Sequence, residues 1–183
     1  MKTVLLINGS PNRNGNTSKA LSLIEDVFTD NNIATVRFEL GNKPVRDCLG
    51  CDNCVQSHRC VFKDDNCNDL IERMLEADGI IIGSPVYFAG ANGALCALLD
   101  RAFYACANHG QLLKDTCAAA VVTVWREGGS AAIDRLNKYF TFSQMNIISS
   151  DYWNVLLNGN DPYGEAVLHK LAVNMSAYLN ERN

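Results

Sequence analysis

Four of the eight cysteines in the 183-residue chain lie within the segment CLGCDNCVQSHRC, at Cys48, Cys51, Cys54 and Cys60. Thiols gathered in this way can form disulfides, ligate zinc, ligate an iron–sulfur cluster or act as redox groups. Structural zinc sites usually pair two C-x2-C units across about 12–20 residues, whereas the first three cysteines here overlap in one run. The spacing C-x2-C-x2-C with a fourth cysteine is closer to the motif that holds four-iron clusters in bacterial ferredoxins.

The other reactive side chains in and around this segment have simpler interpretations. His58 is expected at the surface rather than as a ligand, and Asp64 and Asp65 are expected to cap the helix that follows. We expect the remaining cysteines to be small apolar residues in or beside the core: Cys67, Cys96, Cys106 and Cys117.

Composition favours one soluble globular domain, with 48% hydrophobic and 20% charged residues. The formal net charge is −4, and scattered Lys and Arg residues give no basic stripe for nucleic acid. The apolar run Val4–Ile7 is shorter than the roughly 7–15 residues of a secretory signal, and no stretch approaches the roughly 18 apolar residues of a membrane span. We therefore expect a cytoplasmic protein that binds neither nucleic acid nor membrane, and whose thiols stay reduced.

The positions of these groups depend on strands and helices that alternate along the chain. Nearly continuous apolar runs are typical of strands buried in a parallel sheet. The expected strands cover residues 3–7, 33–38, 79–83, 118–124 and 145–148, and the expected helices cover 17–29, 67–77, 92–106, 130–142 and 164–180. This order predicts a flavodoxin-like, doubly wound α/β domain over residues 1–183, with a five-stranded parallel sheet of order 2-1-3-4-5 and helices on both faces.

One connection in this pattern is far longer than the usual ~2–6 residues between a strand and a helix. It is the excursion over residues 40–66, after the second expected strand, and it contains the four clustered cysteines. A loop of this length inside a compact domain is more often functional than idle.

Ligands of an open parallel sheet bind beyond the carboxyl ends of its strands, where the strand order reverses. The loops after the first, third and fourth expected strands meet there. The first, NGSPNRNGNTS, leads into a helix and offers Ser10, Asn16, Thr17 and Ser18 to a phosphate, although Asn16 and Thr17 also suit a plain helix start. It has neither the Gly-Lys-Ser/Thr of a P-loop nor G-x-G-x-x-G, which favours a mononucleotide.

The other two loops supply flat and small residues. GSPVYFAGANG fixes the strand exit with Pro85 and offers the rings of Tyr87 and Phe88, although such a pair more often packs in a core or an interface. VWREGGSA offers Trp125 and the pair Gly128–Gly129, which permits close backbone approach but is also an ordinary turn.

Three segments together resemble the NADPH-dependent FMN reductase family, and more closely its iron–sulfur flavoprotein branch: GSPNRNGNTS, DCLGCDNCVQSHRCVFKDD and ADGIIIGSPVYFAGANGALCALLDRAF. The resemblance is strong from residue 1 to about 105 and only architectural beyond. It implies that Ser10, Asn16, Thr17 and Ser18 hold the FMN phosphate, that Pro85, Val86, Tyr87 and Phe88 line the isoalloxazine ring, and that Trp125, Gly128 and Gly129 close over it.

Two positions depart from the pattern of the family. Arg13, a further residue expected to contact the FMN phosphate, lies one place later than the basic residue common after the proline, and Cys96 stands where a lysine is usual. The five-residue gap before the last clustered cysteine matches the iron–sulfur branch. The resemblance thus implies a 4Fe-4S cluster on Cys48, Cys51, Cys54 and Cys60. The loop after the second expected strand, which carries these cysteines, is expected on the same rim as the FMN phosphate. Family members with similar cysteines that carry FMN alone leave structural or redox-active thiols as the alternative.

The expected function is an FMN-dependent NAD(P)H oxidoreductase. It would take a hydride from a nicotinamide and pass electrons to a small-molecule or protein acceptor, with no side-chain acid or base required. The resemblance also implies a homodimer or a larger assembly. The alternative is a flavodoxin-type electron carrier, although carriers are typically more acidic and lack the cysteine loop. A hydrolase is disfavoured because the chain has no G-x-S-x-G.

Overall fold

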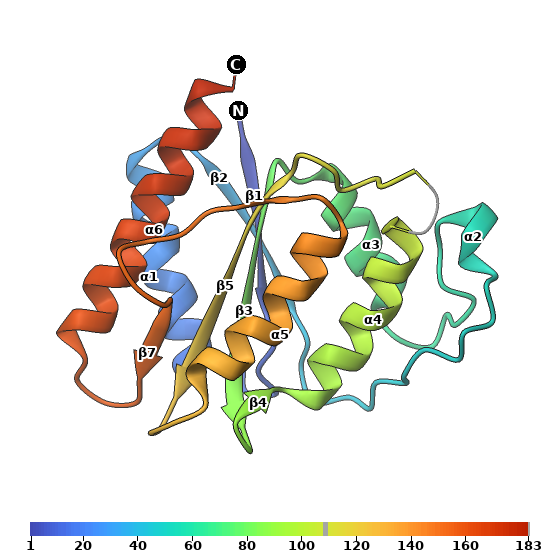
Figure 1. Ribbon diagram of the computed structural model, residues 1–183, viewed down its shortest axis with the longest axis horizontal. Helices are drawn as coiled ribbons and strands as arrows, with labels where there is room; N and C mark the ends of the chain where they lie inside the picture. The colour runs from blue at the N-terminus through green and yellow to red at the C-terminus, as the bar shows by residue number, and fades with distance from the viewer. Residues whose placement is uncertain (108–109, 183) are drawn as a thin grey trace.

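Strands and helices alternate in the structure, a computed structural model that describes residues 1–107 and 110–182 (Figure 1). The strands are β1 (Thr3–Asn8), β2 (Ala34–Glu39), β3 (Gly79–Tyr87), β4 (Gly90–Ala91), β5 (Cys117–Val124), β6 (Asn146–Ile147) and β7 (Val155–Leu157). The helices are α1 (Asn16–Asp30), α2 (Cys54–Ser57), α3 (Cys67–Glu76), α4 (Gly93–Ala107), α5 (Gly129–Phe142) and α6 (Pro162–Glu181). Every strand and helix that the sequence predicts is present, and the short elements β4, β7 and α2 are additional.

Five parallel strands form the sheet in the order β2-β1-β3-β5-β6. This is the predicted order 2-1-3-4-5 once the short strand β4 is set aside, so the flavodoxin-like fold class is confirmed. Two short strands extend the sheet: β4 pairs antiparallel with the end of β3, and β7 pairs in parallel with β5. The strand order reverses between β1 and β3, and the loops that follow these two strands therefore lie at the switch point.

The last strand is divided into two pieces, which the sequence did not predict. β6 pairs with the beginning of β5 at Cys117 and Ala118, and β7 pairs with its end at Val122–Val124. Between them the Asn154 side chain donates a hydrogen bond to the carbonyl of Ala120 at 3.0 Å. This bond satisfies part of the edge of β5 that no strand covers, so the chain can leave the sheet and return.

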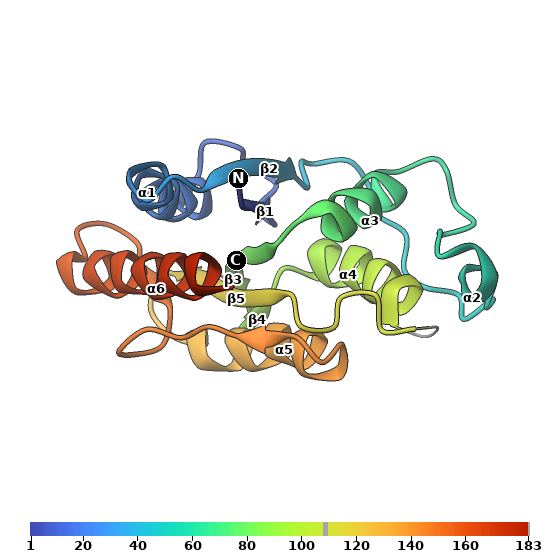
Figure 2. The ribbon, with the colours of Figure 1, turned by 90° about the horizontal axis from the view of Figure 1, so that it is seen from above.

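Both faces of the sheet are covered by helices, as Figure 2 shows. Side chains alternate along each central strand: Leu5 and Ile7 of β1 join the core under α3, α4 and α5, whereas Val4 and Leu6 join the core under α1 and α6. Burial on both sides explains why these strands read as continuous apolar runs rather than as an alternating pattern. Among the described residues, no helix is long and apolar enough to cross a membrane.

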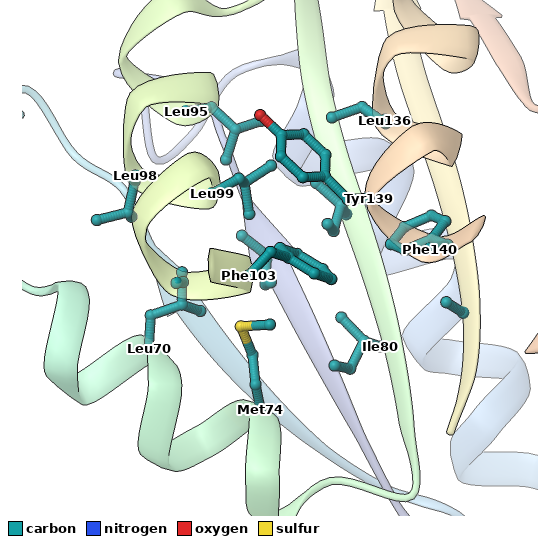
Figure 3. Close-up of a cluster of buried hydrophobic side chains, with 14 of the residues drawn as sticks. Leu70, Met74, Ile80, Leu95, Leu98, Leu99, Phe103, Leu136, Tyr139 and Phe140 are labelled. Atoms are coloured by element: carbon teal, nitrogen blue, oxygen red, sulfur yellow. The ribbon is translucent and has the colours of Figure 1, made fainter. Parts of the chain in front are cut away.

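The core under α3, α4 and α5 fixes the position of α4 (Figure 3). Phe103 of α4 packs against Tyr139 and Phe140 of α5, with ring centroids 5.1 Å and 6.2 Å apart. Leu70 and Met74 of α3 are fully buried in the same cluster. Each such side chain contributes about 1.5–3 kcal/mol through burial, so α4 is held firmly from both neighbouring helices.

Three of the four cysteines outside the CLGCDNCVQSHRC segment belong to the core. Cys67, Cys106 and Cys117 are fully buried, and burial raises the pKa of each thiol to about 12. Their predicted role as small apolar residues is confirmed. Cys96 is half-buried on α4, where burial also raises its pKa, and its carbonyl accepts a hydrogen bond from the Tyr139 hydroxyl at 3.2 Å.

Candidate functional site

Three loops meet at the carboxyl edge of the sheet, as the sequence predicts. The backbone N–H of Gly9, after β1, donates to the carbonyl of Gly83 in β3 at 2.8 Å. A Cβ on Gly9 would lie 2.7 Å from that carbonyl oxygen, so only glycine allows this approach. The loops after β3 and β5 also touch, because a Cβ on Gly128 would lie 2.4 Å from the Cα of Ala89. These contacts form one continuous surface, which we call the strand-end rim (residues 9–17, 84–92, 125–129 and 158).

The loop after β1 is fixed by its own polar groups. The side chain of Asn8 accepts a hydrogen bond from the Ser10 N–H at 3.1 Å, and the Ser10 hydroxyl accepts one from the Asn12 N–H at 3.1 Å. Helix α1 then begins after Gly15, and no side chain caps it. The first N–H groups of a helix have no partner within the helix, so they are free to bind an anion, which the positive end of the helix dipole also attracts.

The predicted phosphate-binding side chains point in different directions. Thr17 is buried, and its hydroxyl is hydrogen-bonded to that of Thr123 at the end of β5, 2.8 Å away. Asn16 donates from its side chain to the side-chain oxygen of Asn158 at 2.7 Å. Ser18 turns outward, where its hydroxyl accepts a hydrogen bond from Arg37 at 3.1 Å. These contacts place Asn16 and Thr17 on the rim and Ser18 beside β2. Arg13 is exposed in the same loop.

The loop after β3 is a tight hairpin whose tip carries an exposed ring. Tyr87 pairs with Gly90 across the turn, and the two residues between them, Phe88 and Ala89, have φ values of 48° and 60°. Two consecutive residues with positive φ define the turn type that usually requires Asn-Gly, so the chain accepts backbone strain here. Phe88 is fully exposed and Tyr87 is half exposed. Strain held at a ligand-facing turn is typical of functional loops.

The strand exit and the loop after β5 complete the rim. Pro85 and Val86 are half-buried at the end of β3. Trp125, directly after β5, is 85% exposed, which leaves its ring free to cover a ligand. Gly128 has a φ of 89° and precedes Gly129, the first residue of α5. The structure therefore brings the predicted residues Pro85 to Phe88 and Trp125 to Gly129 to the same edge.

The four clustered cysteines line one small cavity. Its volume is about 20 Å³, the space of roughly one water molecule, and its other walls include Phe62, Arg101 and Tyr104. Cys48 and Cys51 are exposed, whereas Cys54 and Cys60 are half-buried. Burial raises the pKa of the Cys54 thiol, and negative charge on Cys48, Cys60 and Cys51 raises it further. The Cys54 thiol is therefore close enough to the other three sulfurs for their charge to act on it.

A single metal ion has no preformed site in this arrangement. Within residues 1–107 and 110–182, no three side chains of His, Cys, Asp or Glu converge on one point. The exposed thiol of Cys51 receives hydrogen bonds from the side chain and backbone N–H of Asn53, which hold its pKa below the usual value. A thiol that ionises readily is a better metal ligand and a more reactive group.

Helix α4 carries the partners of the CLGCDNCVQSHRC stretch, residues 48–60, which we call the cysteine segment. Arg101 donates to the sulfur of Cys60 at 3.2 Å, Tyr104 donates to Asp52 at 2.6 Å, and the ring of His58 lies 3.4 Å from the carbonyl oxygen of Ala105. His58 is thus half-buried against α4 rather than fully at the surface. Figure 1 places α2, which contains Cys54, beside the end of α4 that lies away from β4.

These contacts correct one expectation. The excursion starts beside the strand-end rim, where the Leu40 N–H donates to the carbonyl of Asn8, but its cysteines do not stay there. Helix α4 begins at Gly93 beside the rim and rises about 1.5 Å per residue, so Tyr104 lies about 16 Å along the helix axis from that end. The prediction that the cysteines share the rim with the phosphate loop was wrong, because the excursion runs along α4.

The predicted capping of α3 by Asp64 and Asp65 holds only in part, because the N-cap is Asn66, which makes no side-chain capping bond. The Asp65 carboxylate accepts a hydrogen bond from the Cys67 N–H at 3.1 Å, at the start of α3, and forms an ion pair with Arg101. Burial alone would raise the pKa of Asp65, but the Arg101 hydrogen bonds, the Cys67 N–H and the Arg101 charge together hold that pKa below its usual value. Asp64 is exposed and lies 3.7 Å from Arg46.

Three residues of these sites were not identified from the sequence. Thr123 and Asn158 meet the phosphate loop from β5 and from the segment after β7, and nothing local distinguishes them from other polar residues. The burial of Arg101 could have been predicted from the sequence. Together with Asp100, Arg101 is a charged residue inside the otherwise apolar stretch ALLDRAF of α4, and such a position predicts either burial with a partner or a break in the apolar face.

Comparison with known proteins agrees with this geometry. The NADPH-dependent FMN reductase family matches residues 2–157. An iron–sulfur flavoprotein of Methanocaldococcus jannaschii is 32% identical over 149 residues, which cover 81% of this chain and 76% of that protein. An iron–sulfur flavoprotein of Archaeoglobus fulgidus is 30% identical over 161 residues, which cover 88% and 79%.

Solved structures extend the agreement in fold. The crystal structure of RosB with a bound 8-demethyl-8-formylriboflavin-5'-phosphate intermediate has a TM-score of 0.77 and 14% sequence identity, and the match covers 99% of this chain and 80% of RosB. Identity at that level shows the fold alone, whereas the family match and the archaeal relatives show descent. The chain therefore belongs to the NADPH-dependent FMN reductase family and is an FMN-dependent oxidoreductase, on the branch whose curated members are named iron–sulfur flavoproteins.

Proposed function

We propose that the protein oxidises NADH or NADPH with FMN bound at the strand-end rim and passes the electrons to a second acceptor. The observation that carries this proposal is the uncapped start of α1, which lies where the loops after β1, β3 and β5 meet. Its free N–H groups suit a phosphate, and the exposed rings of Phe88 and Trp125 suit a planar ring system. These residues therefore fit FMN.

Bound FMN would supply hydride acceptance, and the chain supplies position and access. The N–H groups at the start of α1 and the polar loop from Ser10 to Asn16 would hold the phosphate. The strained hairpin tip and Trp125 would bracket the ring and exclude water from part of it. The nicotinamide would approach the open side of the rim, where Tyr87 and Phe88 are exposed.

The cysteine segment is proposed to hold a 4Fe-4S cluster on Cys48, Cys51, Cys54 and Cys60. Four thiolates are the ligand set of such clusters, and each binds a different iron, so the thiols need not converge on one point. The cavity between them holds only about 20 Å³, so the exposed stretch from Cys48 to Cys51 must move outward when a cluster is inserted. The support for the cluster is the shared cavity, which all four thiols line, and the proximity of Cys54 to the other three sulfurs.

A cluster at the far end of α4 would lie well away from the flavin of its own chain. This separation supports a further part of the proposal, that the protein works as a homodimer or larger assembly. In such an assembly the cysteine segment of one subunit would lie near the strand-end rim of another, and electrons would cross the interface. The cysteine segment is exposed at the surface, as that arrangement requires.

The alternative is an electron carrier that binds FMN but does not react with a nicotinamide. Anaerobic mixing of the FMN-loaded protein with NADH and, separately, with NADPH distinguishes the two. The proposal predicts that the flavin absorbance bleaches within the time of a catalytic turnover with at least one of them. Flavin that is reduced only by a partner reductase, and by neither nicotinamide, would establish the carrier.

A further inference from the structure

Arg101 is a charged residue in the interior of the protein. It lies on α4, and the residue is only 2% exposed. A buried guanidinium is costly unless its charge is paired and its N–H groups are hydrogen-bonded. The structure shows where those groups go, and each acceptor lies in the cysteine excursion.

The contacts of Arg101 hold the two ends of the cysteine segment together. One terminal nitrogen donates to the carbonyl of Arg46 at 3.1 Å, two residues before Cys48. Both terminal nitrogens donate to the carboxylate of Asp65, five residues after Cys60, in a paired arrangement that fixes the plane of the guanidinium. The guanidinium also lies 5.3 Å from the ring centroid of Phe62. The Arg101 guanidinium therefore joins the two ends of the loop that contains the four cysteines.

The remaining contact reaches a candidate ligand directly. The Nε–H of Arg101 donates to the sulfur of Cys60 at 3.2 Å, a short distance for a bond to sulfur. Hydrogen bonds to the ligand sulfurs are among the features by which a protein sets the reduction potential of an iron–sulfur cluster. Because Asp65 fixes the plane of the Arg101 guanidinium, the Nε–H points toward Cys60 whether or not a cluster is bound.

We propose that Arg101, oriented by Asp65, is a positioning residue for the cluster: it fixes Cys60 as a ligand and raises the cluster's reduction potential through its N–H donation and positive charge. The inference rests on the proposed cluster and adds to it a residue outside the cysteine motif. A positive charge beside a ligand sulfur favours the reduced cluster, which carries one electron more, over the oxidised one. Removal of the charge therefore makes the cluster harder to reduce.

A purely structural ion pair would produce a different result, so the test needs a readout of the cluster itself. Arg101→Gln removes the charge and the guanidinium, and Arg101→Lys keeps the charge. Arg135→Gln is the matched control, because Arg135 lies on the neighbouring helix α5 and forms its ion pair, at 2.8 Å, with Asp100, a residue outside the cysteine segment. Each protein is prepared without oxygen, and bound FMN shows that it is folded.

Iron and sulfide content and the midpoint potential of the cluster, followed by electron paramagnetic resonance, are then compared. We expect Arg101→Gln to lose iron while retaining FMN, or to keep the cluster with a more negative potential. Arg101→Lys should lie between Arg101→Gln and the unaltered protein, and Arg135→Gln should match the unaltered protein. Equal iron content and equal potential in Arg101→Gln and Arg135→Gln would overturn the proposed role of Arg101 but leave the proposed cluster in place. Absence of iron from the unaltered protein would overturn the proposed cluster and this inference with it.

Discussion

The hydroxyls of Thr17 and Thr123 lie 2.8 Å apart in the interior of the protein, one at the start of α1 and the other at the end of β5. This contact ties the phosphate loop to a strand two places away in the sheet. It also means that Thr17 reaches a phosphate only if its hydroxyl serves two partners. A hydroxyl can do so, because it offers one donor and two acceptor positions.

Thr17→Val and Thr123→Val test this arrangement as a pair. Each removes the same buried hydrogen bond and should lower the free energy of unfolding by about 1 kcal/mol. If Thr17 also donates to the phosphate, a charge-assisted bond of about 1.5–3 kcal/mol is lost in Thr17→Val alone. FMN affinity, measured by fluorescence titration, should then fall about ten-fold or more in Thr17→Val and stay within about two-fold in Thr123→Val. Equal affinities would reduce Thr17 to a structural role.

Gly128→Ala should weaken the packing between two loops of the strand-end rim. Gly128 has a φ of 89°, which costs about 1–2 kcal/mol for alanine, and the new Cβ would also press on Ala89 of the hairpin. Gly41→Ala is the matched control, since Gly41 has a φ of 71° but a Cβ there would meet no atom within 4 Å. Both variants should unfold at lower temperature, but only Gly128→Ala should bind FMN more weakly. An unchanged dissociation constant for Gly128→Ala would show that the hairpin and the α5 loop do not act together on the flavin.

Phe88→Asn should relieve strain at the hairpin tip and slow the reaction. Asparagine accepts the left-handed conformation better than phenylalanine, so the free energy of unfolding should rise by up to about 1 kcal/mol. Loss of the exposed ring should reduce the rate of flavin bleaching by the nicotinamide. Gln144→Asn is the control, because Gln144 is exposed with a φ of 55° and lies at the end of α5, away from the rim. It should gain stability with no change in rate. An unaltered rate for Phe88→Asn would mean that the ring takes no part in the reaction.

Asp65 should make the protein acid-sensitive. Its folded pKa lies below the unfolded value of about 3.9, so the stability it contributes is complete above about pH 4 and is lost as pH falls through the folded pKa. Asp65→Asn should be less stable at pH 6 by about 3–5 kcal/mol, because Arg101 stays buried without its counter-charge. The difference between the two proteins, measured by urea unfolding, should narrow below pH 4. A constant difference from pH 6 to pH 3 would contradict the assignment.

The sequence was informative where burial acts on both sides of an element. Runs such as VLLI of β1 and IIIG of β3 are apolar throughout because their side chains pack alternately into the two core clusters. Such runs identify the strands of a parallel sheet, and from their alternation with helices the sheet order and the meeting of the three loops could be predicted. The elements that were missed, β4, β7 and α2, have two to four residues and no periodic pattern. β4 arises from the tight hairpin with β3, and β7 depends on its pairing with β5, next to the Asn154 bond to that strand.

The residue groups of the candidate site could be predicted from the sequence, but their positions relative to one another could not. The cysteine spacing identifies a group of thiols, but the distance of that group from the rim depends on how the excursion runs along α4, which no local pattern encodes. The direction of the Thr17 side chain depends on Thr123, more than a hundred residues away. Arg101 contacts Arg46, Cys60 and Asp65, so its role becomes visible only when α4 and the excursion are seen together.

The most direct test of the account is the metal and flavin content of protein made and kept without oxygen. We expect one FMN, about four irons and about four sulfides per chain, as a 4Fe-4S cluster requires. Cys51→Ser should lose the iron and retain FMN, because the strand-end rim, where FMN is proposed to bind, lies at the other end of α4. Cys96→Ser, which changes a half-buried cysteine outside the segment, should retain both. FMN without stoichiometric iron, even after chemical reconstitution, would contradict the cluster, and the cysteine segment would then be a thiol-bearing loop of a flavoenzyme.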